Sequence, residues 1–221
     1  MDYQELIILI IEIIGTVAFS ISGAMVGTRR GMDIFGVCVL GVVTAVGGGM
    51  IRDIILGITP PNVFREPVYA LVAVLTACVV FIAIYLNKTP FSGSERQAYE
   101  RLILMMDSIG LGIFTVMGVL TGVREGYVNN TFFLVFLGTT TGVGGGLLRD
   151  MMAGVPPYIF VRHIYACASI VGALICVYLY RLTNALAAMI IASAVVVLIR
   201  FLAAHYRWNL PSMAERDIEK D

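Results

Sequence analysis

Two copies of a Gly-Gly-Gly-x-x-Arg-Asp motif hold the residues of this sequence that could do chemistry. The first copy runs from Gly47 to Asp53, and the second runs from Gly144 to Asp150, at an offset of 97 positions. Both copies lie in strongly apolar surroundings, where a charged side chain is costly and normally pairs or marks an ion path. The motif therefore predicts an intramembrane polar network, an ion pathway, or both.

Six ionisable residues form the predicted polar network: Glu12, Arg52, Asp53, Asp107, Arg149 and Asp150. Because successive residues on a helix point about 100° apart, each arginine is expected to pair with an acid on another helix, with Glu12 and Asp107 as the candidates. Four acids against two arginines leave a formal surplus of negative charge, which favours a cation over an anion. Alternatively, each Arg-Asp pair only pins its helix to a neighbour.

Three successive glycines weaken a spanning helix by roughly 1 kcal/mol each relative to alanine and favour kinking or unwinding. The predicted pore kinks are Gly47, Gly48, Gly49, Gly144, Gly145 and Gly146. Freed carbonyls are natural cation ligands, which places a potassium ion near the carbonyls of Gly48 and Gly145. On this reading, leucine at Gly48 and Gly145 abolishes flux and leaves assembly intact. The alternative is close helix packing, which small residues permit.

Hydroxyl side chains at a similar depth could line a hydrated path: Ser20, Ser22, Thr44, Ser108, Thr115, Thr139, Thr140 and Thr141. Each one alone is weak evidence, because helical serine and threonine often bond to their own backbone. The sequence has no nucleophile and base pair, metal-ligand cluster or nucleotide-binding loop, so neither an enzyme nor a cofactor is expected.

The elements that position these residues follow from composition. The chain is 59% hydrophobic and 14% charged, and its mean hydropathy of +0.90 nearly excludes a soluble domain. Zero net charge without a basic block argues against nucleic acid and leaves membrane lipids as the expected partner.

A spanning helix needs about 20 apolar residues. The predicted spans are 4–27, 34–56, 67–86, 102–122, 131–153, 163–181 and 184–203.

The duplication extends beyond the motif. At an offset of 95, Glu12 matches Asp107, and Phe19 matches Phe114. Because each unit has three helices, the second enters the membrane from the opposite side. We expect an all-α integral membrane protein with seven transmembrane helices, arranged as two inverted three-helix repeats plus a seventh helix. The expected divisions are a first repeat at 1–86, a linker loop at 87–101, a second repeat at 102–181, a seventh helix at 182–204 and a polar C-terminal tail at 205–221.

Basic residues predict the orientation of the chain. On the side of the C-terminus we count ten: Arg29, Arg30, Lys88, Arg96, Arg101, Arg162, Arg200, Arg207, Arg216 and Lys220. The opposite side has three: Arg65, Arg124 and Arg181. Lysine and arginine concentrate in cytoplasmic loops, so the C-terminus is expected in the cytoplasm.

The duplicated motif at Gly47 to Asp53 and Gly144 to Asp150, with the three-plus-three-plus-one helix plan, resembles the prokaryotic branch of the trimeric intracellular cation (TRIC) channel family. The resemblance spans nearly the whole chain. It implies a homotrimer in which each protomer has its own pore through the first six helices for monovalent cations, chiefly potassium. Animal members have a lysine-glutamate pair where this chain has arginine and aspartate, so their lipid and calcium regulation is not transferred.

The leading functional hypothesis is a potassium-permeable channel of the inner or plasma membrane that conducts passively between the repeats. Related bacterial sequences are also labelled as glycine transporters. The rival hypothesis is therefore a secondary transporter of a small amino acid such as glycine, which would use the same interrupted helices for its substrate.

Overall fold

A computed structural model describes residues 3–86, 93–161, 164–206 and 208 of the chain. Within this part the regular elements are all helices, and seven of them are long and apolar enough to cross a membrane. The seven are α1 Tyr3–Arg29, α2 Ile34–Leu56, α4 Val68–Leu86, α5 Gly93–Arg124, α6 Thr131–Met152, α8 Tyr165–Leu182 and α9 Ala185–His205. Two short helices, α3 Asn62–Arg65 and α7 Tyr158–Val161, follow the two motif helices. The predicted fold class is confirmed.

The helix ends follow local sequence signals. The side chain of Asp33 accepts a hydrogen bond from the backbone of Gly36 at the start of α2, and Asn130 and Asn184 cap α6 and α9 in the same way. Helix α2 ends at Leu56 and is capped by Gly57, whose φ of 71° is a left-handed conformation that favours glycine. The apolar runs therefore become helices whose ends are set by capping side chains.

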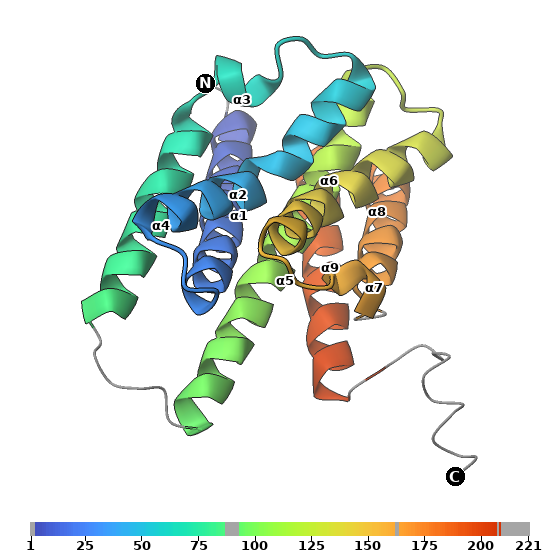
Figure 1. Ribbon diagram of the computed structural model, residues 1–221. Coiled ribbons are helices and arrows are strands. Elements are labelled where there is room, and N and C mark those ends of the chain that lie inside the picture. Colours follow the sequence, from blue (N-terminus) through green and yellow to red (C-terminus); the bar gives the residue numbers. More distant parts are fainter. Residues whose placement is uncertain (1–2, 87–92, 162–163, 207, 209–221) are drawn as a thin grey trace.

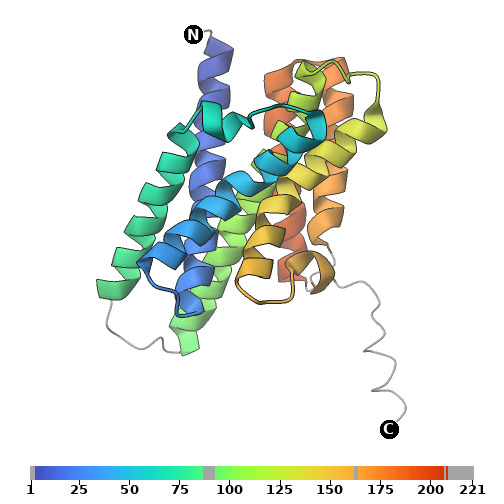
Figure 2. The same cartoon turned by 45° about the horizontal axis from the view of Figure 1, so that its top comes forward.

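The two repeats are inverted relative to each other. Helices α1, α2 and α4 pack together, and so do α5, α6 and α8. Helix α1 runs downward in Figure 1, whereas its counterpart α5 runs upward. The repeats meet along α1 against α5 and α2 against α6, while α9 packs on α5 and α8 only in the second repeat. Figure 2 shows α2 (blue to cyan) and α6 (yellow to gold) side by side in the middle of the bundle, running in opposite directions.

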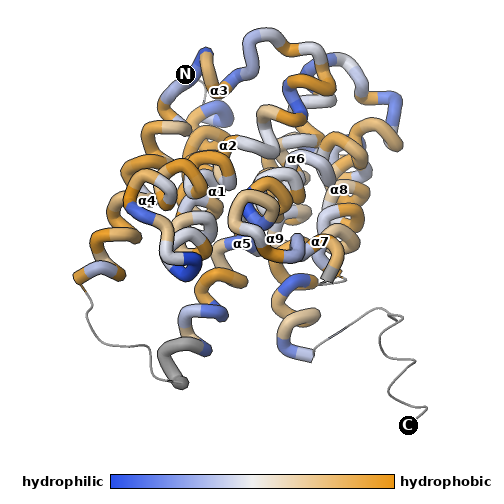
Figure 3. Tube along the Cα trace, viewed as in Figure 1, coloured by the Kyte–Doolittle hydropathy of each residue, from blue (hydrophilic) through white to orange (hydrophobic). Residues whose placement is uncertain are grey.

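Hydropathy is distributed as a membrane requires. Hydrophobic residues cover the long helices, including nearly all of α4, and hydrophilic residues gather toward the ends and loops (Figure 3). Helix α4 has the highest mean hydropathy of the seven, 2.6, and only 11% of its most apolar stretch is buried by the rest of the chain. An apolar helix face left uncovered by protein is suited to lipid.

One expected division is wrong in part. Helix α5 begins at Gly93, so residues 93–101 are helical and do not belong to a linker loop. Residues 87–92 of that loop lie outside the described residues, as does nearly all of the tail 205–221. Apolar periodicity stops at Leu102, but the preceding polar residues are good helix formers and continue the helix. The side chain of Tyr99 there donates a hydrogen bond to the carbonyl of Met25 at 2.6 Å.

Candidate functional site

The glycine triplets lie where the backbones of α2 and α6 are in close contact. We call this contact, of Gly48 with Thr141 and of Gly145 with Thr44, the helix crossing. A Cβ atom added to Gly48 would be 2.0 Å from the backbone oxygen of Thr141, and one added to Gly145 would be 2.1 Å from that of Thr44. These distances are below any real carbon contact, so only glycine fits at either position. The two contacts are equivalent in the repeat, because Thr44 and Thr141 are also 97 positions apart. The crossing is therefore a backbone-to-backbone contact on the pseudo-twofold axis.

Both triplets remain α-helical throughout. The backbone of the triplets is therefore not unwound, and the contacts of Gly48 and Gly145 are those of close helix packing, whereas a role of the triplets as pore kinks stays a prediction. Carbonyls inside a continuous helix accept hydrogen bonds from the following turn, so they are less available to a cation than unwound ones. Instead of intact assembly, we expect leucine at Gly48 and Gly145 to disrupt the packing, because each side chain would overlap backbone atoms of the facing helix.

Each Arg-Asp pair ties the end of its motif helix to the short helix that follows. Arg52 Nε donates to Asp53 Oδ1 at 2.9 Å, and the backbone N–H of Asn62 donates to Asp53 Oδ2 at 2.8 Å. Sequence reasoning predicted pairing to another helix instead of this adjacent pair. Neighbouring side chains leave a helix about 100° apart, but the arginine side chain is long enough to bend around the helix surface to the adjacent aspartate.

The second repeat reproduces this arrangement and adds to it. Arg149 Nε donates to Asp150 Oδ1 at 2.8 Å, and the backbone N–H of Tyr158 donates to Asp150 Oδ2 at 2.9 Å. Arg149 Nη1 also donates to Asp107 Oδ1 at 2.7 Å and to the hydroxyl of Ser22 at 2.6 Å. Here the predicted pairing between helices is present, because α5 brings Asp107 against α6. The side chains of Arg149 and Asp107 are fully buried.

Glu12, the counterpart of Asp107, lies differently. It accepts a hydrogen bond from the hydroxyl of Tyr69 on α4, and among the described residues no ion pair joins it to Arg52. Tyr69 is the counterpart of Tyr165, whose hydroxyl lies 3.4 Å from Asp107 Oδ1. The inverted repeats therefore place similar residue types at both ends. Among the described residues, only the second repeat joins its motif arginine to the counterpart acid, through the ion pair between Arg149 and Asp107.

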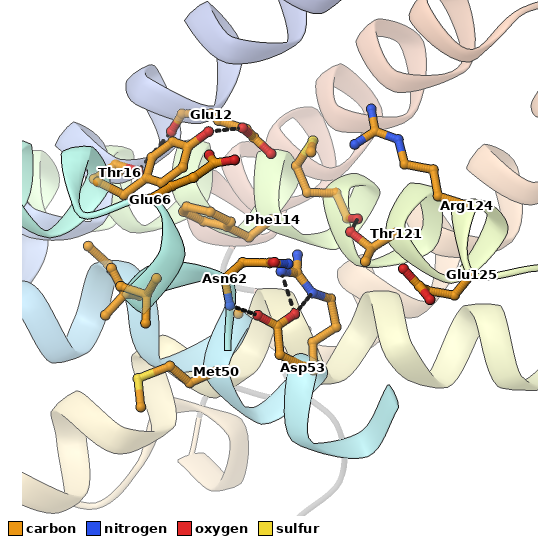
Figure 4. A pocket seen from close by; sticks show the side chains of 17 residues that line it. Glu12, Thr16, Met50, Asp53, Asn62, Glu66, Phe114, Thr121, Arg124 and Glu125 are labelled. Carbon is orange, nitrogen blue, oxygen red and sulfur yellow. Dashed lines mark hydrogen bonds and ion pairs between the residues drawn. The ribbon is translucent and has the colours of Figure 1, made fainter. Parts of the chain in front are cut away.

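A cavity of about 340 Å³ occupies the end that holds Glu12. We call it the vestibule. Figure 4 shows Asp53 and Asn62 on one wall, Glu12, Thr16 and Glu66 on a second, and Thr121, Arg124 and Glu125 on a third. Arg52, which is bonded to Asp53, also lines the vestibule. Buried Arg52 and Asp53 line its inner part, and exposed Glu66, Arg124 and Glu125 form its rim. The vestibule reaches inward to Gly49, Phe114 and Met117 near the helix crossing.

Four carboxylates and two guanidinium groups line the vestibule. Asp53 is neutralised by Arg52, so Glu12, Glu66, Glu125 and Arg124 decide the local charge. The formal balance of the lining is two negative charges, the sign that attracts cations. Charges in a partly enclosed space act more strongly than on an open surface, because less water screens them.

The middle of the bundle is closed by aromatic and apolar packing. The rings of Phe19 and Phe114 stack with centroids 5.3 Å apart. The two phenylalanines are counterparts of each other in the repeats. The ring of Phe19 packs against Gly110, where an added Cβ atom would lie 2.1 Å from the ring. Beyond them the Asp107 and Arg149 cluster is sealed from solvent. In the described part of the chain, the Glu12 end thus holds the vestibule, and the Asp107 end is closed by buried side chains.

The predicted hydroxyls mostly serve packing. Thr44, Ser108 and Thr141 donate to carbonyls one turn back in their own helices, as such residues often do. Ser20 donates to the carbonyl of Ala73 at 2.7 Å, and Thr115 bonds Ser169 at 2.7 Å, so both join helices. Thr139 has a buried hydroxyl without a hydrogen-bond partner in the described part of the chain. None of the eight, Thr140 included, lines the vestibule.

Sequence reasoning missed several residues of the site. Tyr69 and Tyr165 match at an offset of 96, a signal that was available once the repeat was known. Asn62, Glu66, Thr121 and Arg124 line the vestibule from loops and helix ends and carry no motif. Arg200 was counted among basic loop residues, which is wrong, because it lies within α9 and is 3% exposed.

Fold and site define a polytopic α-helical membrane protein whose inverted repeats enclose a polar, one-sided cavity. The sequence family described as "Glycine transporter" matches residues 9–85 and 104–181, which correspond to the two repeats. The UPF0126 inner membrane protein YadS of Escherichia coli K12 is 35% identical over 207 residues, 92% of this chain and 95% of the relative. The UPF0126 membrane protein YvgT of Bacillus subtilis is 31% identical over 94% of this chain and 96% of its own length.

Solved structures of related proteins have the same fold as this chain. The TRIC channel orthologue of Rhodobacter sphaeroides superposes with a TM-score of 0.81 at 32% identity, covering 91% of this chain and 99% of that one. A prokaryotic TRIC channel crystallised in 0.5 M KCl gives a TM-score of 0.82 at 30% identity, over 93% of this chain and all of that one. The chain belongs to this family, the prokaryotic branch of the TRIC channels, as its motifs indicated.

Proposed function

We propose that this protein is a potassium-permeable monovalent cation channel of the inner or plasma membrane. The observation that carries the proposal is the vestibule, whose lining has an excess of carboxylates and reaches inward to the crossing of α2 and α6. Cations are concentrated there by the local field and pass between the two repeats without a covalent step or a cofactor. The solved relatives at 30 to 32% identity are described as cation channels, which supports the proposal.

Three further features belong to the proposal. The pathway lies within one protomer, between the helices of its two repeats, both of which contribute residues to the vestibule, such as Glu12 and Thr121. Protomers assemble as homotrimers, as the name of the related channels indicates. The C-terminus faces the cytoplasm, so the vestibule opens on the opposite side of the membrane. Correcting Arg200 to a buried position leaves nine basic residues against three, which does not change the predicted orientation.

Replacing Glu12 with glutamine tests this use of the vestibule. We expect potassium efflux from proteoliposomes to fall about fivefold, because one negative charge is lost from a cavity that faces the ion path, while Tyr69 can still donate its hydrogen bond. The matched control is Glu5→Gln, an exposed position on the same helix outside the vestibule. Equal efflux through Glu12→Gln and wild type at low salt would remove Glu12 from the conduction path.

A carrier of a small amino acid such as glycine is the second candidate. It is favoured by a specific observation, namely that Arg124 and Glu12 line the same vestibule from different helices. A zwitterion needs a cationic group for its carboxylate and an anionic group for its ammonium. Saturable uptake of labelled glycine with counterflow, and no unitary current, would favour this candidate over the channel.

A further inference from the structure

Arg200 lies on α9, the long helix that belongs to neither repeat. Its side chain contacts the buried cluster of Asp107 and Arg149. Its Nη2 atom lies 3.7 Å from Asp107 Oδ2, and its guanidinium carbon lies 4.7 Å from the centre of the Tyr165 ring. Its side chain is 4% exposed. Helix α9 packs on α5 and α8, the helices that carry Asp107 and Tyr165. The first repeat has no counterpart of α9 among its helices.

This single residue changes the charge of one end of the pathway. Glu12, Arg52 and Asp53 together carry a formal charge of minus one, and so do their counterparts Asp107, Arg149 and Asp150. Arg200 adds one positive charge to the second set only, which makes it neutral. These two sets of residues therefore differ in formal charge because of α9. The two ends also differ in form, since the negative end is hollow and the neutral end is sealed.

The contact between Arg200 and Asp107 is close enough for electrostatic attraction but too long for a hydrogen bond. In the described part of the chain, Arg200 Nε and Nη2 and Asp107 Oδ2 have no hydrogen-bond partner. Buried donors and acceptors without partners are unfavourable, so this contact is held less firmly than the bond from Arg149 to Asp107 at 2.7 Å. Arg200 can leave Asp107 more easily than Arg149 can.

We propose that Arg200 is a charge lock that closes the Asp107 end of the pathway to cations. The guanidinium group of Arg200 repels cations and lies against Asp107 Oδ2. When Arg200 moves away, the formal charge of this end becomes negative. This inference rests on the proposed channel function. It assigns a role in gating to the seventh helix, which stands outside the two repeats.

Two substitutions at the same position separate charge from packing. Arg200→Met removes the charge and suits the apolar surface of α9, whereas Arg200→Lys keeps the charge. We expect Arg200→Met to raise potassium efflux from proteoliposomes roughly tenfold, the order expected for one elementary charge at about 10 Å in partly hydrated surroundings. Arg200→Lys should conduct like the wild type. Where the wild type conducts potassium, an unchanged efflux through a folded Arg200→Met protein would overturn the lock.

A second readout does not depend on conduction. Dicyclohexylcarbodiimide modifies accessible carboxyl groups in membranes, and mass spectrometry of peptides locates the modified residue. We expect modification of Asp107 in Arg200→Met and protection in the wild type and Arg200→Lys. Unchanged modification overturns the lock, whether or not current flows.

Increased modification without potassium flux in any variant would support the lock and contradict the channel. If Arg200→Met does not fold, raised efflux and modification in a folded Arg200→Lys protein would overturn the proposal.

Discussion

Arg149→Ala is expected to destabilise the protein by about 3–5 kcal/mol, because it leaves buried Asp150 without its ion-pair partner and Asp107 with only the longer contact to Arg200. Arg149 is fully buried and donates to both Asp107 and Asp150. A loss of this size should lower the apparent melting temperature in detergent by about 10 °C. Size-exclusion chromatography and thermal unfolding of the purified variant measure the effect.

The matched control is Arg52→Ala at the equivalent position of the first repeat. Arg52 contacts Asp53 but makes no ion pair with Glu12 among the described residues, and it lines the vestibule. Water can enter the vestibule and solvate the remaining carboxylate, so we expect a loss below about 2 kcal/mol. Equal destabilisation by the two substitutions would contradict the difference between the closed and the hollow end.

Gly48→Ala is expected to disrupt the crossing of α2 and α6. Its Cβ atom would lie 2.0 Å from a backbone oxygen of α6, which cannot move aside as a flexible side chain can. Overpacking of this kind costs about 3 kcal/mol or more when backbone must shift. We expect a lower melting temperature and lost potassium flux, and Gly145→Ala should behave alike because its contact is equivalent.

The neighbouring substitution Gly49→Ala is the control. The nearest atom to its added Cβ would be Arg52 Nη2 at 3.8 Å, an ordinary contact. Alanine is a better helix former than glycine by about 1 kcal/mol, so Gly49→Ala should keep or raise stability. If Gly49→Ala were as destabilising as Gly48→Ala, the triplet would matter as a flexible segment and not as a packing contact.

The helix plan was predictable because it depends on local sequence. Seven apolar runs of spanning length and a repeat with a nearly constant offset define which helices correspond. An odd number of helices per repeat then requires inversion. The start of α5 was misplaced because polar residues 93–101 continue the helix beyond the apolar run.

The role of individual site residues was harder to predict because it depends on which helix faces which. Glycine triplets are compatible with both unwinding and close packing, and only the distance from Gly48 to Thr141 separates these alternatives. Arg200 near the end of an apolar helix looks like an interfacial anchor until α9 is placed against Asp107. The vestibule is assembled from loops and helix ends, so its lining has no sequence pattern.

Cation conduction is best tested by recording current through the purified protein in a planar bilayer under a potassium chloride gradient. We expect discrete unitary steps that reverse near the potassium equilibrium potential, with smaller steps in Glu12→Gln. Reversal near the chloride potential would contradict cation conduction. No unitary current, together with saturable glycine uptake and counterflow in proteoliposomes, would contradict the channel and support the carrier.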